Sequence, residues 1–344
     1  MLKMEDIKSV VKSGNNFKIS WKMTDWCNYR CKYCYMSSAV SKCDNNTPFE
    51  KILEIASHID DIINVQAKGR KVVLHLIGGE VGYYDLVKVI DSIKSPLLKC
   101  VIIATNFSNK LEYWENLDNY CKSRGICLNI IASFHLDYCN RDEFVEKAIK
   151  LGASVKCVIN NDNLAIYKPY FEKILPYGNR IECTVERDSI NKSEQLTPEN
   201  YEYVNNLNKR LKKRGIYFYV TLNDGTVVEY PTNISFINDI EGGMYLPHNF
   251  YCTAGLDGIR INQKGDLLRA ACTWCSSKFG PGKLGNICDK YILPTDPIIC
   301  NCLKIPTEKI DENGHKTGEA DYENTRKKGC TCFCNSSMFK EYNK

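Results

Sequence analysis

The stretch Lys71–Ile77, with the sequence KVVLHLI, decides the fold class of this chain of 344 residues. Its apolar and β-branched side chains indicate a buried strand. A helical pattern of apolar residues follows at Tyr83–Ile93, and a second strand of the same kind, KCVIIAT, follows at Lys99–Thr105. A buried strand, a helix and another buried strand in series are typical of a βαβ unit, whose two strands run parallel.

The same alternation extends from residue 17 to about residue 220 and gives six strand–helix units in series. Such a series predicts an α/β fold with a parallel sheet wrapped by helices, either an open doubly wound sheet or a partial barrel. The expected strands are Phe17–Met23, Lys71–Ile77, Lys99–Thr105, Ile126–Phe134, Ala153–Ile159 and Arg180–Val185. The expected helices are Pro48–Gln66, Tyr83–Ile93, Lys110–Arg124, Asp142–Leu151, Leu164–Leu175 and Thr197–Arg214.

The overall composition is that of an ordinary globular protein, with 44% apolar residues, 25% charged residues and a net charge of +5. This charge is too small to indicate a nucleic-acid partner, because nucleic-acid-binding modules carry a concentrated basic face. We interpret the basic run Lys209–Arg214 as the solvated end of a helix. No apolar stretch is long enough to span a membrane, and the first residues lack the apolar core of a secretory signal. We therefore expect a cytoplasmic protein without a membrane partner.

The pattern changes after about residue 221, where cysteines and turn residues become frequent and helical periodicity fades. Ile259–Asn262 and Leu267–Ala271 flank a turn and predict a β-hairpin. We interpret the polar stretch Thr307–Lys328 as an exposed insertion. A boundary between residues 225 and 250 would divide the chain into a barrel domain at 1–225, a connecting segment at 226–251 and a small cysteine-rich domain of hairpins and helix at 252–344.

The chain contains 19 cysteines, which are unevenly placed. Nine of them lie between Cys252 and Cys334, and four lie near the amino terminus. Without a secretory signal, clustered cysteines are metal ligands more often than disulfide partners. Six further cysteines stand inside apolar or amphipathic segments, where we expect small core side chains. These six are Cys100, Cys121, Cys127, Cys139, Cys157 and Cys183.

Directly after the first expected strand stands the motif Cys27-Asn-Tyr-Arg-Cys31-Lys-Tyr-Cys34. Three thiolates on one tight loop can hold three corners of a cubane iron–sulfur cluster, which normally takes four cysteines. Because the next cysteine, Cys43, lies nine residues on, one iron would stay open for an exogenous ligand. A zinc knuckle and an incidental group of cysteines are the alternatives. Zinc sites favour pairs of C-x2-C or additional histidines, and this loop has no histidine close by in the sequence.

The loop resembles the signature of the radical S-adenosylmethionine (SAM) superfamily, in which an aromatic residue such as Tyr33 precedes the third cysteine. The second strand ends in Gly78-Gly79-Glu80, similar to the GGE motif of that family, although Val81 replaces the usual proline. The third strand ends in Thr105-Asn106, with Phe107 in place of a frequent glycine. The resemblance implies a partial (β/α)6 TIM-like barrel with its site at the carboxyl ends of the strands. It implies cluster ligation by Cys27, Cys31 and Cys34, and SAM contacts from Tyr33, Gly78, Gly79, Glu80, Thr105, Asn106, Ser133, His135 and Asn160.

The resemblance also implies a specific chemistry. The open iron of a [4Fe–4S] cluster binds the amino and carboxylate groups of SAM, and the reduced cluster passes an electron to the sulfonium. The products are methionine and a 5′-deoxyadenosyl radical, which abstracts a hydrogen atom from an unactivated C–H bond. The protein then has to bind and orient the substrate and exclude solvent, while the cofactor supplies the difficult step.

The carboxyl-terminal cysteines resemble the auxiliary-cluster extensions called SPASM and twitch domains. Cys252 and Cys272 stand at the two ends of the expected hairpin, where antiparallel pairing would bring them together. The resemblance implies one or two auxiliary [4Fe–4S] clusters, although the C-x2-C-x5-C-x3-C pattern usual in SPASM domains is absent. Zinc in part of this region is the alternative, and Cys275 and Cys288 stay unassigned. The expected ligands are Cys252, Cys272, Cys300, Cys302, Cys330, Cys332 and Cys334.

The substrate class stays open between a peptide, which we favour, and a small molecule. Only 26 residues precede Cys27, so we expect no amino-terminal leader-binding module. That fits an enzyme of peptide or protein maturation that reads a short peptide directly or uses a separate recognition protein. It fits equally a dehydrogenase or epimerase acting on an aminoglycoside or another sugar. A nucleotide is a less favoured substrate, because the sequence shows no concentrated basic patch.

A flavodoxin or ferredoxin is the expected electron donor for either class of substrate. The non-enzymatic alternative is an iron–sulfur electron carrier, against which the ordered SAM motifs argue. No catalytic acid, base or hydrogen donor can be singled out among so many thiols.

Overall fold

The computed structural model describes residues 2–34, 46–186, 196–209, 218–230, 250–269, 282–299, 307–310, 316–321 and 338–341. The chain divides into two compact units. The barrel unit comprises Ile19–Arg214 together with Ile261–Gly265, and the second unit comprises Met1–Lys18, Gly215–Arg260 and Asp266–Lys344. The boundaries predicted from the sequence, at 1–225, 226–251 and 252–344, divide the chain by function. They stay a prediction.

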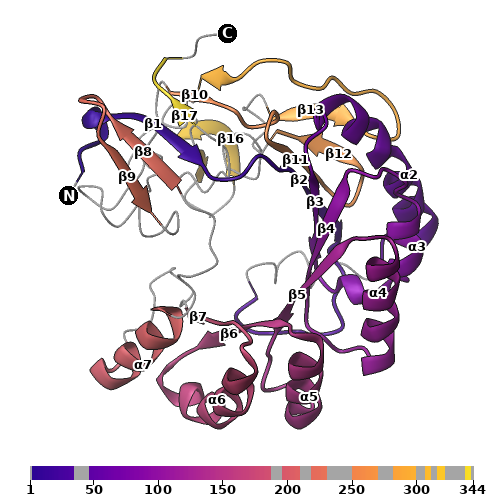
Figure 1. The fold of residues 1–344 in the computed structure, drawn as a ribbon, viewed down its shortest axis with the longest axis vertical. Coiled ribbons are helices and arrows are strands. Elements are labelled where there is room, and N and C mark those ends of the chain that lie inside the picture. Colours follow the sequence, from indigo (N-terminus) through magenta and orange to yellow (C-terminus); the bar gives the residue numbers. More distant parts are fainter. Residues whose placement is uncertain are drawn as a thin grey trace. The chain divides into compact units, whose positions relative to one another are not determined.

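The barrel unit contains six strands that neighbour one another in chain order, from β2 to β7. Every pair from β3 to β7 is parallel, as βαβ units require. The helices follow the outer side of this curved row of strands (Figure 1). The predicted α/β fold of the partial-barrel type is therefore confirmed. The strands are β2 (Phe17–Thr24), β3 (Val72–Gly78), β4 (Leu98–Thr105), β5 (Cys127–Ser133), β6 (Ser154–Ile159) and β7 (Ile181–Val185).

The helices agree with the sequence pattern except where a local capping residue intervenes. The expected helix Tyr83–Ile93 is split, because the Asp85 side chain accepts a hydrogen bond from the Lys88 amide and starts a new helix. One helix begins earlier than expected, since Asn160 and Asn163 form a capping box before Leu164. The helices are α2 (Phe49–Gln66), α3 (Leu86–Asp91), α4 (Leu111–Ser123), α5 (Arg141–Leu151), α6 (Asn161–Ile174) and α7 (Pro198–Lys209), with single 3-10 turns at Met4–Asp6, Val81–Tyr83 and Leu175–Tyr177.

Aromatic side chains pack tightly behind the carboxyl ends of β4 and β5. Phe134, which follows β5, stacks on Phe144 of α5 with ring centroids 4.3 Å apart. Phe107, which follows β4, packs on Trp114 of α4 at 5.2 Å. All four rings are at most 1% exposed. The ends of these two strands therefore rest on a rigid layer, because packed aromatic pairs have few alternative arrangements.

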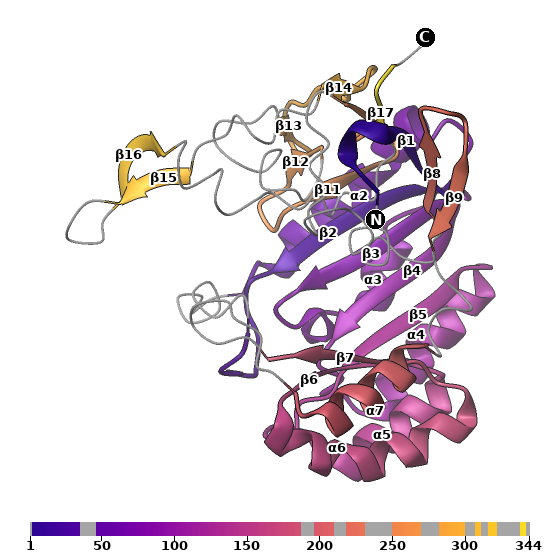
Figure 2. The ribbon, with the colours of Figure 1, turned by 90° about the vertical axis from the view of Figure 1, so that its left-hand side faces the viewer.

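The second unit contains a sheet of six short strands in the order β14-β10-β17-β1-β8-β9, whose described pairs are antiparallel. β1 was not predicted from the sequence, and it pairs with β8, a strand more than 200 residues away. Figure 2 shows β1 beside the β8–β9 hairpin. The strands are β1 (Ile7–Lys12), β8 (Phe218–Leu222), β9 (Val227–Tyr230), β10 (Tyr251–Cys252), β14 (Ile298–Ile299) and β17 (Met338–Phe339).

The predicted hairpin near residue 265 is present as β11 (Gly258–Ile261) and β12 (Asp266–Leu268), and β13 (Lys283–Asn286) pairs with β12. Cys252, however, does not end this hairpin. It lies on β10, and a turn closed by the Leu256 amide and the Thr253 carbonyl separates it from β11. The other expected end, Cys272, lies outside the described residues.

The polar stretch predicted as an insertion contains a small hairpin of its own. β15 (Thr307–Ile310) pairs antiparallel with β16 (Lys316–Asp321), and the rest of Thr307–Lys328 lies outside the described residues. The basic run after Lys209 also lies outside them. None of the helices in the described part of the chain combines the length and apolar character that a membrane crossing requires.

Candidate functional site

The loop after β2 brings Cys27, Cys31 and Cys34 to one cavity of about 470 Å³ in the barrel unit. All three thiols are partly exposed and free of disulfide bonds. The opposite wall consists of the carboxyl ends of β3 to β6, as expected for the active end of a parallel barrel. Arg30 and Lys32 of the loop add positive charge to the lining. The residues at or just after the strand ends that line the cavity are Ile77, Gly78, Gly79, Ala104, Thr105, Asn106, Ser133, His135 and Val158.

The spacing of the three thiols suits a cluster better than one zinc ion. Within the described part of the chain, the three sulfur atoms are not gathered within 4.8 Å of one another. A tetrahedral zinc ion with bonds of about 2.3 Å would need its sulfur ligands only about 3.8 Å apart. In a cubane cluster each thiolate binds a different iron atom, so the sulfurs stand farther apart. The donor set thus fits the [4Fe–4S] group that the sequence motif indicates.

Burial keeps the thiols of Cys27 and Cys31 protonated when no metal is bound. It raises the pKa of Cys27, which the hydrogen bond from the Tyr29 amide partly offsets. Burial also raises the pKa of Cys31 to about 11, and the neighbouring thiols Cys27 and Cys34 add to this effect. Binding of a metal centre must therefore displace protons from this loop.

Tyr33 and His135 form an aromatic wall beside Cys31. Their rings stack with centroids 5.8 Å apart, and the Tyr33 hydroxyl lies 2.9 Å from His135 Nδ1. The Cys31 sulfur lies 3.4 Å from the same nitrogen. Burial lowers the pKa of His135 to about 4, so the imidazole is neutral near pH 7. Its Nδ1 can therefore accept a hydrogen bond from the Tyr33 hydroxyl.

A second aromatic pair at the loop was not predicted from the sequence. Tyr29 stacks on Tyr138 at 4.9 Å, and the Tyr138 hydroxyl donates to the Arg30 carbonyl at 2.7 Å. Tyr29 also packs edge-on against His135 at 5.7 Å. The signal was available in part, because Tyr29 stands inside the cysteine motif, but nothing in the sequence pairs it with Tyr138.

Gly78 and Gly79 allow the end of β3 to approach the backbone that leads to Cys27. The Gly79 amide donates to the Thr24 carbonyl at 2.9 Å. A side chain on Gly79 would place its Cβ 1.8 Å from the Trp26 carbonyl oxygen, and one on Gly78 would lie 2.4 Å from that of Thr24. Only glycine fits these two positions.

The Glu80 side chain lies between the ends of β3 and β4. It is buried and is not among the groups that line the cavity. The carboxylate accepts hydrogen bonds from the Gly82 amide at 2.7 Å, the Thr105 hydroxyl at 2.6 Å and the Asn106 amide at 2.6 Å. Burial raises the pKa of Glu80, and these three donors oppose that shift. In this structure Glu80 joins the end of β3 to the end of β4.

Asn160 stands at the start of α6, after the end of β6. Its side chain caps α6 and donates to a Glu186 carboxylate oxygen at 2.8 Å, while the cavity wall at β6 is formed by Val158. The other predicted SAM contacts, namely Tyr33, Gly78, Gly79, Thr105, Asn106, Ser133 and His135, all line the cavity.

The cysteines outside the loop fall into three groups. Cys121, Cys157, Cys183 and Cys252 are buried. Cys100, Cys139 and Cys288 are partly exposed, and Cys127 is exposed at the start of β5, so it is not the core side chain that we expected. The remaining cysteines, Cys43, Cys272, Cys275, Cys300, Cys302, Cys330, Cys332 and Cys334, lie outside the described residues.

Comparison with solved structures finds SuiB from Streptococcus suis bound to S-adenosylmethionine, with 13% identity and a TM-score of 0.48. SuiB bound to the precursor peptide SuiA has 15% identity and a TM-score of 0.49. Both alignments cover 81% of this chain and 64% of the SuiB chain. BtrN in complex with AdoMet and 2-DOIA has 15% identity and a TM-score of 0.31, with coverage of 80% of this chain and 79% of BtrN. No curated protein sequence matches the chain significantly.

The sequence profile of the Radical SAM superfamily matches residues 21–224. This region is more than half of the chain and includes the cysteine loop and all six strands of the barrel unit after the first residues of β2. The members of this superfamily are enzymes. The chain therefore belongs to the radical SAM superfamily.

Proposed function

We propose that this protein cleaves SAM reductively at a [4Fe–4S] cluster held by Cys27, Cys31 and Cys34. One observation carries the proposal: the three thiols share a cavity with seven of the nine residues that the family motif assigns to SAM. When bound, the cluster supplies the electron that splits SAM into methionine and a 5′-deoxyadenosyl radical, which abstracts a hydrogen atom from the substrate.

The residues of the chain bind, orient and shield in this scheme. Gly78 and Gly79 bring the backbone of β3 close to the cysteine loop. Tyr33 and His135 supply an aromatic wall for the nucleoside part of SAM. Glu80 acts indirectly in this proposal, because its carboxylate fixes Thr105 and Asn106 at the rim of the cavity. Asn160 likewise fixes the start of α6.

The test is reductive cleavage of SAM by anaerobically reconstituted protein with dithionite. The wild type should produce 5′-deoxyadenosine and methionine, and Cys27→Ala/Cys31→Ala/Cys34→Ala should produce neither. The matched control is Cys100→Ala/Cys127→Ala, which removes two accessible thiols from the amino-terminal halves of β4 and β5. Undiminished cleavage by the triple variant would overturn the ligand assignment.

We further propose that residues 252–344 form an auxiliary-cluster domain of the SPASM or twitch type, after a barrel domain at 1–225 and a connecting segment at 226–251. Sheet register supports this proposal. Cys252 is paired with Ile298 on one side and Met338 on the other, which stand two residues before Cys300 and four residues after Cys334 in the sequence. Cys272, Cys302, Cys330 and Cys332 complete the proposed ligands.

Iron content tests the auxiliary domain. The triple variant of the cysteine loop should retain about four iron atoms per chain for one auxiliary cluster, or about eight for two. Cys252→Ala should lower the iron content of the wild-type protein by up to one cluster. A triple variant that holds no iron, or that holds zinc instead, would overturn the auxiliary-cluster proposal. The proposal for the first cluster would not be affected.

We propose a peptide as the substrate, on the ground of the SPASM-like cysteine pattern, with a flavodoxin or ferredoxin as electron donor. A separate protein would recognise the peptide where a leader is present. The test follows deuterium from a labelled candidate substrate into 5′-deoxyadenosine. Transfer from a peptide supports the proposal, whereas transfer only from an aminoglycoside, another sugar or a nucleotide would replace it with a small-molecule dehydrogenase or epimerase.

A further inference from the structure

The turn that follows β4 has an unusual backbone. Phe107 has a positive φ of 62°, and Lys68 is the only other non-glycine residue with positive φ in the described part of the chain. A left-handed conformation is unfavourable for a residue with a bulky side chain and persists only where the surroundings hold it. Phe107 is 1% exposed and directly follows Asn106, which lines the cavity.

Side-chain packing holds the Phe107 ring in place. The ring contacts Trp114 of α4 at 5.2 Å and meets Phe144 of α5 edge-on at 5.6 Å. The Lys147 ammonium nitrogen lies 5.3 Å from the ring centroid, which allows a cation–π contact. The Phe107 amide donates to the Thr105 hydroxyl at 2.9 Å. The strained residue is thus fixed on both its side chain and its backbone.

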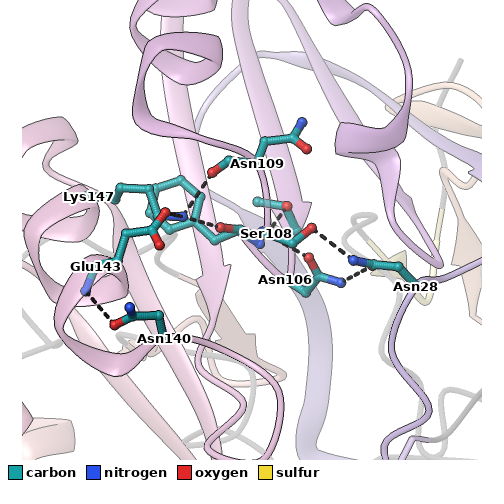
Figure 3. A network of polar contacts seen from close by, with 9 residues as sticks. Asn28, Asn106, Ser108, Asn109, Asn140, Glu143 and Lys147 are labelled. Atoms are coloured by element: carbon teal, nitrogen blue, oxygen red, sulfur yellow. Dashed lines mark hydrogen bonds and ion pairs between the residues drawn. The ribbon is translucent and has the colours of Figure 1, made fainter.

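Lys147 fixes the carbonyl groups of the same turn. Its ammonium donates to the Phe107 carbonyl at 2.8 Å and the Asn109 carbonyl at 2.9 Å, and pairs with Glu143 at 3.1 Å. The Lys147 side chain is only 5% exposed, and these three acceptors use all its protons. Asn140 caps the helix that carries both Glu143 and Lys147. Figure 3 shows the ammonium between Glu143 and the turn.

The other face of the turn holds the cysteine loop. Asn106 Nδ2 lies 2.7 Å from Asn28 Oδ1 and 3.7 Å from the Cys27 sulfur. Asn28 Nδ2 in turn donates to the Ser108 hydroxyl at 3.1 Å, and the Ser108 amide donates to Asn106 Oδ1 at 3.1 Å. These contacts form a closed ring of polar groups between Asn28 and the turn (Figure 3).

We propose that Lys147 and Phe107 are positioning residues, which lock the turn at 106–109 in its left-handed form so that Asn106 and Ser108 hold Asn28 and Cys27. The inference deepens the proposed function, since it rests on Cys27 as a cluster ligand for its effect on reactivity. A hydrogen bond to a cluster sulfur stabilises the reduced, more negative state and raises the reduction potential. Loss of the lock therefore lowers the potential through Asn106.

A double-mutant cycle tests this route. The midpoint potential is measured by electron paramagnetic resonance (EPR) titration of the signal that SAM perturbs, for Lys147→Met, Asn106→Leu and the double variant. Both single variants should lower the potential, and the double variant should equal Asn106→Leu alone, because residues acting through one contact are not additive. Full additivity would mean that Lys147 acts only through its charge, and no shift in Lys147→Met would mean that it is merely structural. Either result overturns the proposal.

Hydrogen exchange of the cluster-free protein gives a readout that does not depend on SAM chemistry. In Lys147→Met, the amide hydrogens of peptides covering residues 27–31 and 106–109 should exchange at least about threefold faster than in the wild type. The matched control is Lys150→Met. It removes another lysine of α5, which is exposed and pairs with Glu115 of α4. It should leave both segments unchanged. Faster exchange confined to α5 and 106–109 would overturn the proposal.

A second variant covers the case in which Lys147→Met does not fold. Phe107→Gly accepts the left-handed backbone without strain but removes the ring contacts. It should accelerate exchange at 27–31 and lower the cluster potential, and an unchanged value of both would overturn the inference. Wild-type protein that fails to cleave SAM while these exchange results hold would refute the proposed function alone. Normal cleavage with unchanged exchange in both variants would refute only the lock.

Discussion

Two groups of neighbouring cysteines in the barrel unit differ in what surrounds their sulfur atoms. Cys157 and Cys183 are register partners on β6 and β7, with sulfurs 3.4 Å apart and both side chains buried. The three thiols of the cysteine loop instead line a cavity, and the Cys27 sulfur accepts the Tyr29 amide at 3.4 Å. Proximity of thiols alone therefore does not mark a metal site. Access and hydrogen-bond donors distinguish the loop from the buried pair.

A loop thiol and a core thiol have similar pKa values. Burial raises the pKa of Cys31 in the loop and of Cys121 in the core of α4 to about 11 in each case. Thiolate content is then similar, so a difference in reactivity must come from access. Cys121 is 0% exposed, whereas Cys31 stands at the cavity.

The largest expected effect is therefore on thiol alkylation. In the metal-free protein, iodoacetamide should label Cys31 about 1,000-fold faster than Cys121, which corresponds to a local opening free energy of about 4 kcal/mol. Peptide mass spectrometry over time measures both rates in one sample, and exposed Cys127 reports the reagent's activity. Similar rates for Cys31 and Cys121 would remove the contrast in access.

The next effect concerns the backbone beneath the loop. Gly79→Ala should lower the free energy of unfolding by about 3 kcal/mol, because its Cβ would overlap the Trp26 carbonyl oxygen. Gly69→Ala is the control. It has a positive φ of 76° but no neighbouring atoms within 4 Å, so it should cost only about 1 kcal/mol. Urea unfolding of the metal-free variants measures both values. Equal costs would mean that the close approach of β3 to the loop is not required.

Alkaline pH should reduce the stability that a buried thiol such as Cys121 contributes. Cys121 has its pKa raised from 9.0 to about 11, so its contribution to stability is complete below pH 9 and is lost as the pH rises through 11. Two pKa units correspond to up to about 2.7 kcal/mol. The stability of Cys121→Ala relative to the wild type should therefore improve between pH 9 and pH 11 in urea titrations. A constant difference across this range would contradict the buried, neutral thiol.

The smallest of these effects tests whether the Glu80 carboxylate holds the ends of β3 and β4 together or reaches SAM. Glu80→Gln should lower the free energy of unfolding by about 2 kcal/mol. The side-chain amide nitrogen of the glutamine would face a hydrogen-bond donor, where a carboxylate oxygen now accepts a hydrogen bond. Urea unfolding and SAM titration of the reconstituted protein measure the two consequences. Unchanged stability with tenfold weaker SAM binding would instead show that the carboxylate reaches the ligand, as the family motif suggested.

The sequence predicted the six strand–helix units because each strand and each helix has a clear apolar period of its own. It did not predict β1, whose pairing partner β8 lies more than 200 residues away and whose own pattern, IKSVVK, is short. The cysteine loop and the two glycines could be placed at the site because all strand ends of a parallel barrel meet there.

The contacts of Glu80 and Lys147 could not be predicted in the same way. The sequence shows a carboxylate after two glycines, but it does not show that Thr105 and the Asn106 amide would surround it. Lys147 is one of several charged residues on α5, and only the fold reveals that it points inward to two carbonyl groups. Tertiary contacts decide such assignments, since the residue type alone allows both a surface and a buried position.

The central claim is that the cysteine loop holds a cluster with one iron open to SAM. EPR spectra of the dithionite-reduced protein, recorded with and without SAM, test it most directly. We predict that SAM changes the signal of the wild type and has no effect on the signal that remains in Cys27→Ala/Cys31→Ala/Cys34→Ala. A wild-type signal that does not respond to SAM, or a response that persists in the triple variant, would contradict the claim.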